Sequence, residues 1–199
     1  MKKVTLFATL ALALALSASA QQMIDFTGLS DTNSPQAVPN GYQHLGWSGL
    51  FYVDALTYGD ANGNPNSGPG FYSGPEALVA FGGGPMCFPK YGAKVADGVP
   101  TKNICESVIS SGIGPTAFSY FKVDLLSISS GWTSGFATFQ AYKDGVQVGS
   151  DWQQPLTTKA QTLSVSAGTL PNWGKISELR IHPSPGGSFV LYVMEVEQK

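Results

Sequence analysis

Alternating hydrophobic and polar residues mark the second half of this chain and predict β-strands. Residues 136–142 alternate with period two, which is the period of a strand with one buried face. The alternation places Phe136, Thr138, Gln140 and Tyr142 on one face and Ala137, Phe139 and Ala141 on the other. Asp144-Gly145 follows directly and is a strong short-range signal for a β-hairpin, so residues 146–148 are predicted to return as the second strand.

Similar patterns predict strands along most of the remaining chain. Residues 118–128 alternate with Phe121, Val123 and Leu125 predicted on one face. Gly46 and Gly49 interrupt an apolar run over residues 42–53, which predicts bent or bulged strand pieces. Shorter runs predict strands over residues 23–26, 77–81, 161–166, 176–181 and 188–196.

The spacing of these runs favours one all-β domain. The strands recur about every 8–14 residues, which is typical of a sandwich or barrel. Residues 58–75 are rich in Asn, Gly and Pro and are predicted to form a loop, and residues 82–115 are predicted to form a second, longer loop with one short strand. We therefore predict a single jelly-roll-like antiparallel β-sandwich of about 8–10 strands over residues 21–199.

The first twenty residues predict a secretory signal peptide. Lys2 and Lys3 form a basic start, residues 6–16 are almost entirely apolar, and Ala18-Ser19-Ala20 is a small-residue cleavage site. The apolar run is shorter than the roughly 20 residues of a membrane-spanning helix. We expect residues 1–20 to be removed and the domain to be secreted and extracellular, without a membrane anchor because no hydrophobic tail precedes Lys199.

Charge argues against nucleic acid as a partner. Charged residues make up 12% of the chain, against about 25% in an average soluble protein. Loss of Lys2 and Lys3 would take the formal net charge from −2 to −4. No basic run would then remain, so binding to nucleic acid is not expected.

The chain has two cysteines, Cys87 and Cys105. An even pair in an oxidising compartment favours a disulfide, here closing a loop of about 18 residues and contributing on the order of 3 kcal/mol. A reactive thiol is the alternative, but neither residue belongs to a C-x-x-C motif.

Several short motifs occur in an order that resembles a known group of secreted proteins. They are Ile24-Asp25-Phe26, Pro39-Asn40-Gly41-Tyr42, Ala77-Leu78-Val79-Ala80-Phe81, Phe139-Gln140-Ala141-Tyr142-Lys143-Asp144-Gly145, and Trp173 followed by Ile176. Their order resembles the β-sandwich ectodomains of bacterial exoproteins of the PEP-CTERM type and of small secreted fungal proteins. It also looks like the jelly-roll architecture of carbohydrate-binding modules. The resemblance implies a β-sandwich and, by analogy with those modules, a glycan ligand.

No cofactor or metal is expected, although two segments bear on structural calcium. Jelly-roll binding modules often hold calcium with an Asp on the last strand, but the matching residues here, 191–195, contain none. Residues 60–66 carry oxygen ligands at alternate positions, as a calcium-binding loop does. Pro65 and Phe71 stand where an EF-hand needs Gly and Glu, so a cluster of turns is favoured there.

Aromatic residues are the clearest candidates for ligand binding. Trp152 and Trp173 lie in polar, turn-like contexts and are predicted to be exposed, where an indole face can stack on a sugar ring. Tyr58 and Tyr72 flank the Asn/Gly/Pro loop and are predicted to extend that surface. The other two tryptophans, Trp47 and Trp132, are predicted to be in the core.

The sequence offers fewer candidates for catalytic groups than for aromatic ligand-binding residues. Asp25 and Glu76 lie beside apolar runs and are the best candidate carboxylates, and Asp25 is favoured as a structural, hydrogen-bonded carboxylate. A polysaccharide lyase would need a base and a positive group. The candidate sets are His44 with Tyr42 and His182 with Arg180. Arg180 and His182 lie in a Leu-Arg-Ile-His strand, a pattern that favours a solvent-facing position for both side chains.

These observations favour a non-catalytic extracellular binding protein. The predicted ligand is a cell-wall or matrix polysaccharide, bound by aromatic stacking and by hydrogen bonds from Asn and Gln. Two alternatives stay open: a lyase or glycosidase on the same fold, and a host-directed effector or structural protein.

Overall fold

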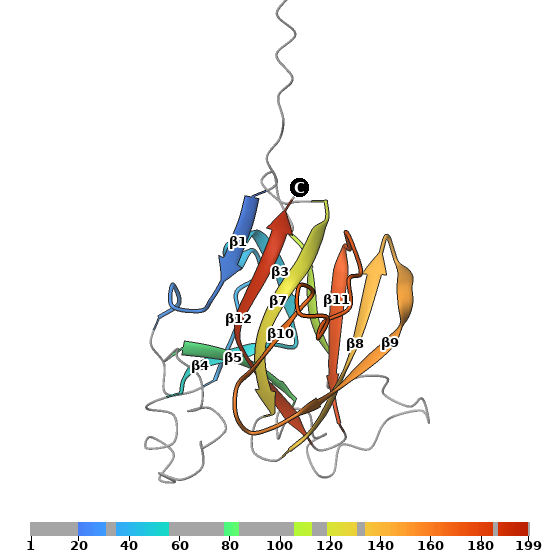
Figure 1. Cartoon of the computed structure of the whole chain (residues 1–199). Helices are drawn as coiled ribbons and strands as arrows, with labels where there is room; N and C mark the ends of the chain where they lie inside the picture. The colour runs from blue at the N-terminus through green and yellow to red at the C-terminus, as the bar shows by residue number, and fades with distance from the viewer. Residues whose placement is uncertain are drawn as a thin grey trace, which may run out of the picture.

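The protein is an all-β sandwich (Figure 1). The computed structural model describes residues 20–30, 35–55, 78–83, 106–112, 119–130, 134–184 and 187–198. Within these ranges twelve strands form two antiparallel sheets, which confirms the predicted fold class and exceeds the predicted number of strands.

The seven-stranded sheet is built around β12. Its strands are β1 (Ala20–Ile24), β2 (Gln36–Ala37), β4 (Phe51–Asp54), β5 (Leu78–Gly83), β7 (Phe121–Ser130), β10 (Gln161–Ser164) and β12 (Ser188–Gln198). Their order is β10-β7-β12-β5-β4-β2, and β1 also pairs with β12. Along one edge β12 pairs with β7, and along its other edge it pairs first with β5 and then with β1.

The five-stranded sheet has the order β3-β6-β11-β8-β9. Its strands are β3 (Leu45–Ser48), which follows the short 3-10 helix η1 (Tyr42–His44), β6 (Ser107–Ser111), β8 (Gly135–Lys143), β9 (Val146–Leu156) and β11 (Glu178–Pro183). The predicted hairpin joins β8 and β9, with Lys143 paired to Val146. Asp144 and Gly145 have φ values of 52° and 79°, the left-handed conformation that this two-residue turn requires.

The main hydrophobic core lies between the two sheets. Ala137, Phe139 and Ala141, which the alternation placed together on one face of the strand, are buried in it. Trp47 is also buried, as predicted, and its indole Nε1–H donates a hydrogen bond to the carbonyl oxygen of Tyr42 at 2.8 Å. Burial of the large apolar side chains of both sheets is the main favourable term in folding.

The prediction that Leu125 shares a face with Phe121 and Val123 is wrong. The register between β7 and β12 shifts between Val123 and Leu125, so Asp124 is an extra residue on β7. Such a β-bulge sets two residues of one strand against one of its partner and resets the alternation. Leu125 is consequently only half-buried, and Leu126 occupies the core instead.

A second bulge, at Tyr192 of β12, supports a smaller hydrophobic cluster on the outer face of the seven-stranded sheet. That cluster consists of Val53, Ala55, Val79, Phe81, Val190 and Tyr192. Tyr192 is fully buried, and its hydroxyl forms a 2.9 Å hydrogen bond with the hydroxyl of Ser129. The middle of this sheet is therefore buried on both faces.

The predicted break at Gly49 is the corner where the chain passes from one sheet to the other. It separates β3 of the five-stranded sheet from β4 of the seven-stranded sheet. Gly49 has a φ of 69°, and a side chain there would overlap the backbone carbonyl oxygen of Glu106. Gly46, by contrast, lies inside β3 and pairs with Ser110.

Replacing Gly49 by alanine is expected to lower the free energy of unfolding by about 2 kcal/mol or more, because strain and steric overlap add. The melting temperature followed by circular dichroism is expected to fall by about 4–8 °C. Gly149→Ala is the matched control, because Gly149 has a φ of 74° but open space where a Cβ would lie. Equal losses in the two variants would contradict the role of Gly49 as a crowded corner.

Candidate functional site

A groove lies where the edge strands of the two sheets, β9 and β10, approach each other. Its volume is about 470 Å³, within the usual range of about 300–1,000 Å³ for small-molecule sites. We call it the Trp152 groove, and its lining residues are Trp152, Gln154, Gln161, Thr162, Leu163, Gly168, Thr169, Leu170 and Pro171.

Local structure explains why these residues meet. Trp152 and Gln154 are two positions apart on β9 and therefore share a face. The chain then crosses between the sheets at the lower end in Figure 1 and returns as β10. After β10, the backbone N–H groups of Thr169 and Leu170 both donate to the carbonyl oxygen of Ser164 at 3.1 Å, which closes a tight loop over the groove.

Trp152 lies inside β9, so the prediction that it occupies a polar turn is wrong. Phe139 pairs with Trp152 and Ala141 pairs with Val148, so three residues of β9 lie opposite Gln140. The left-handed Gly149 begins this bulge, and the strand continues beyond it. The glycine and its polar neighbours looked like the end of a strand in the sequence.

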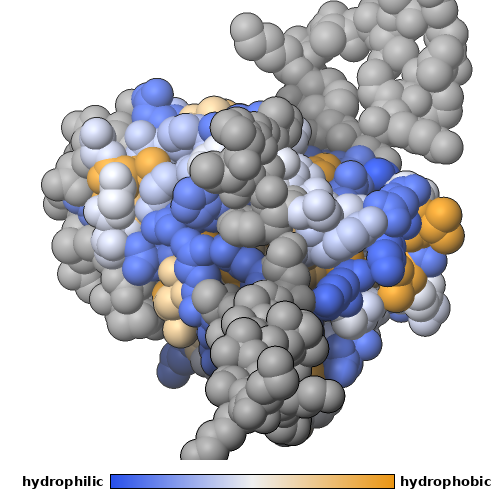
Figure 2. Space-filling model, turned by 90° about the horizontal axis from the view of Figure 1, so that it is seen from above, coloured by the Kyte–Doolittle hydropathy of each residue, from blue (hydrophilic) through white to orange (hydrophobic). Residues whose placement is uncertain are grey.

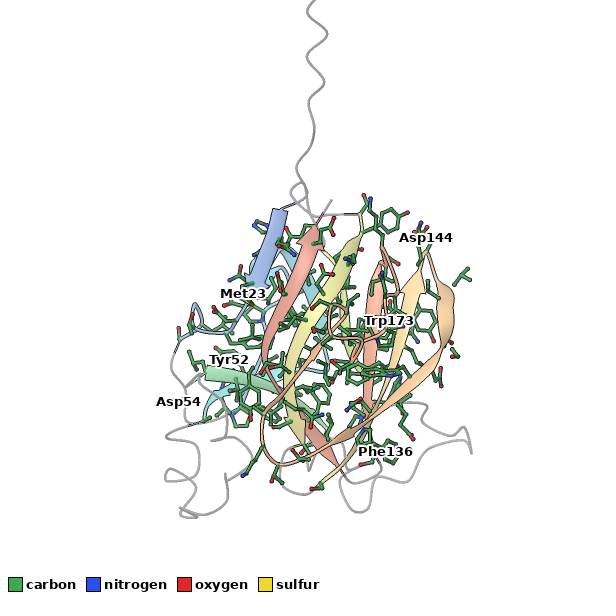
Figure 3. The ribbon with its side chains drawn as sticks, in the orientation of Figure 1. Met23, Tyr52, Asp54, Phe136, Asp144 and Trp173 are labelled. Atoms are coloured by element: carbon green, nitrogen blue, oxygen red, sulfur yellow. The ribbon has the colours of Figure 1, made fainter. Side chains whose placement is uncertain are left out.

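The indole of Trp152 is half-buried and held by two other rings. Its centroid is 5.1 Å from that of Phe139, and it meets Trp173 edge to face at 6.2 Å with an interplanar angle of 74°. Trp173 does lie in a turn, where the side chain of Asn172 accepts a hydrogen bond from the N–H of Gly174 at 3.0 Å. Figure 3 shows Trp173 at mid-height of the sandwich, between the labelled ends at Asp144 and Phe136.

Trp173 is itself half-buried against the core, and it is not among the residues lining the groove. The exposure predicted for both tryptophans is therefore only partial. The structure brings the two predicted ligand-binding tryptophans together, with Trp152 lining the groove and Trp173 packed edge to face against it.

Two glutamines at the groove donate hydrogen bonds to the same backbone oxygen. The side-chain amide nitrogens of Gln154 and Gln161 both donate to the carbonyl oxygen of Pro155, at 3.1 and 2.9 Å. Because Gln161 belongs to β10 and Pro155 to β9, the second bond spans the two sheets. These glutamines were not identified from the sequence, since only the folded structure brings them together.

A separate polar cluster, the Arg180 network, covers the outer face of the five-stranded sheet. Arg180 and His182 alternate with the buried Leu179 and Ile181, as predicted for a solvent-facing pair. The members of the network are Glu106, Gln140, Tyr142, Gln147, Asp151, Glu178, Arg180 and His182.

The guanidinium of Arg180 is surrounded by partners. Its Nη1 lies 3.1 Å from Oε1 of Glu106, and its Nε donates to Oε1 of Glu178. The group also stacks on the ring of Tyr142, with its central carbon 4.2 Å from the ring centroid. The positive charge of Arg180 is therefore offset by two carboxylates and an aromatic ring.

Gln140 connects His182 to Asp151. Its amide nitrogen donates to the Asp151 carboxylate at 2.9 Å, which turns its amide oxygen toward Nε2 of His182 at 3.1 Å. Since an amide oxygen only accepts, His182 donates from Nε2. Hydrogen bonds from Gln147 and Gln140 stabilise the Asp151 carboxylate and hold its pKa below the ordinary value.

Asp25, Tyr42 and His44, the other predicted catalytic residues that the structure describes, belong to neither cluster. Asp25 accepts hydrogen bonds from the N–H and hydroxyl of Thr27 at 3.0 and 2.7 Å, as predicted for a structural carboxylate. His44 is exposed in η1, and the hydroxyl of its neighbour Tyr42 donates to the carbonyl oxygen of Asp25 at 2.9 Å.

Several predictions fall outside the described residues. These concern Tyr58, Tyr72, Glu76, Cys87, Cys105, Trp132, the loop at 60–66 and the signal peptide over residues 1–20, of which only Ala20 is described. The disulfide, the tyrosine part of the ligand surface and the core position of Trp132 stay predictions.

The described surface on the face seen in Figure 2 is largely polar. Figure 2 shows the molecule from above, where hydrophilic residues make up most of the coloured surface and hydrophobic residues form small patches. Within the ranges given above, no three His, Cys, Asp or Glu residues are arranged to hold a metal ion. Nor does that part of the chain contain a helix with the length and apolar character needed to cross a membrane.

Comparison with protein-family models and with curated proteins gave no match. No protein-family model matches the chain, and no curated protein is similar to it. Function is therefore inferred from the residues and their geometry.

Replacing Gln147 by leucine is expected to raise the pKa of Asp151 toward its ordinary value, because the main hydrogen bond to the carboxylate is lost. A carboxyl-carbon NMR titration measures this directly. With the pKa lowered in the folded state, the contribution of Asp151 to stability is present at neutral pH and is lost as the pH falls below the ordinary value. Gln153→Leu, on the same strand, is the control, and equal titration midpoints in both variants would contradict the assignment.

Proposed function

We propose that this protein binds a glycan in the Trp152 groove and leaves it chemically unchanged. The observation that carries the proposal is the position of the Trp152 indole, which lines a groove whose polar groups are amides and hydroxyls. Sugar rings present C–H groups that pack on aromatic faces and hydroxyls that bond to polar side chains. The groove offers both kinds of contact.

The packing behind Trp152 supports this function. Phe139 and Trp173 hold the indole in one place before any ligand arrives. A side chain that is already fixed loses little conformational entropy on binding, so more of the contact energy contributes to affinity. The signal peptide predicted over residues 1–20 favours an extracellular polysaccharide, from a cell wall or matrix, as the ligand.

Catalysis at the Arg180 network is the second candidate. The structure does bring Arg180, His182 and Tyr142 together, the residue types named above for a polysaccharide lyase. A lyase, however, needs a positive group to neutralise the substrate carboxylate. Arg180 is already neutralised by Glu106 and Glu178, so this arrangement favours a binding protein over a lyase.

Replacing Trp152 by alanine is expected to weaken polysaccharide binding by at least about tenfold, because the stacking surface is lost. Retention of the purified domain on a panel of soluble and insoluble polysaccharides measures the effect. Val146→Ala is the matched control, since Val146 is on the same strand but 70% exposed at the hairpin end. That variant is expected to bind like the unmodified protein.

New reducing ends or unsaturated uronate products in the same samples would contradict the non-catalytic proposal and direct attention to the Arg180 network. Absence of both binding and products across the panel would also contradict it, and would favour a protein-directed or structural role. Equal binding by the Trp152 and Val146 variants would place the ligand elsewhere.

A further inference from the structure

We propose that the Trp152 groove selects neutral glycans over acidic ones, and that the side-chain oxygens of Gln154 and Gln161 recognise the ligand's hydroxyl groups. This inference rests on the proposed glycan-binding function and specifies the class of glycan. It follows from the orientation of the two amides and from the charge of the groove.

The orientation of both amides is fixed by one backbone oxygen. The carbonyl oxygen of Pro155 only accepts hydrogen bonds, so each glutamine must turn its NH₂ group toward it. The amide oxygens of Gln154 and Gln161 consequently point away from Pro155. Among the described residues, none donates a hydrogen bond to either oxygen, so both are acceptors for a ligand.

Proline at this position fits the edge of a sheet. Pro155 lies on β9, the last strand of the five-stranded sheet, where a residue without an N–H is tolerated. The two glutamines reach the same carbonyl from β9 and from β10. Because both hydrogen bonds end on this one carbonyl oxygen, they set the positions of the side-chain oxygens of Gln154 and Gln161 relative to each other and across the groove.

An amide oxygen discriminates between ligand groups by their ability to donate a hydrogen bond to it. A sugar hydroxyl donates a hydrogen bond to it, whereas an ionised uronate carboxylate has no proton to give and repels the oxygen's partial negative charge. None of the described residues that line the groove is charged. A uronate would therefore lose its hydrating water there without gaining an ion pair, which is unfavourable.

Isothermal titration with oligosaccharides of matched length tests this selectivity. The probes are a neutral β-glucan oligosaccharide, a chitin oligosaccharide and an oligogalacturonate. We expect the protein to bind at least one neutral probe at least about tenfold more tightly than the oligogalacturonate.

Three variants test the role of the glutamines. Gln154→Leu and Gln161→Leu are each expected to weaken neutral-probe binding about five- to tenfold, because one hydrogen bond is lost. Gln153→Leu is the matched control, because Gln153 is an exposed glutamine on the opposite face of β9. Gln154→Lys is expected to strengthen oligogalacturonate binding relative to the neutral probe, a gain that a misfolded variant would not show.

The outcomes separate this inference from the proposed function. Binding that depends on Trp152 but is equal or tighter for the oligogalacturonate would overturn the selectivity and leave glycan binding intact. Neutral binding that depends on Trp152 but not on Gln154 or Gln161 would overturn the role of the amides. No binding of any probe, in a protein that also fails the polysaccharide panel, would overturn both proposals.

Discussion

The pairing of β12 with three other strands is the constraint on which the rest of the structure depends. β12 holds β7 along one edge and β5 and β1 along the other, and Ala20 of β1 pairs with Gln198 near the end of the chain. Residues of β12 contribute to the cores on both faces of the sheet. The groove depends on the same pairing, because β12 positions β7, and β7 in turn carries β10, which forms one wall.

Much of this architecture can be predicted from the sequence where the alternation is undisturbed. The period-two pattern separated the residues of β8 into two faces, and Asp144-Gly145 identified the β8–β9 hairpin. The prediction failed at bulges. An extra residue at Asp124 changed the face of Leu125, and the bulge beginning at Gly149 concealed the continuation of β9. A bulge is set by register with a partner strand, which a local pattern does not reveal.

The candidate site could be predicted only in part, because its residues come from segments that meet only in the folded chain. Trp152 and Trp173 were identified from their polar surroundings, but their edge-to-face contact joins β9 to a turn 21 residues later in the chain. The bond from Gln161 to Pro155 joins two sheets. On the outer face, alternation predicted that Arg180 faces solvent but not that it is paired with Glu106 and Glu178, and these ion pairs are the observation that we weigh against lyase chemistry.

The most direct test of the account is an NMR titration of the ¹⁵N-labelled domain with a neutral oligosaccharide that it binds. We expect the indole N–H signal of Trp152 and the side-chain amide signals of Gln154 and Gln161 to shift together and saturably. The side-chain signals of Gln140 and Gln147, in the Arg180 network on the opposite face of the same sheet, are expected to stay in place. Shifts confined to Gln140 and Gln147, with the Trp152 signal unmoved, would contradict the account.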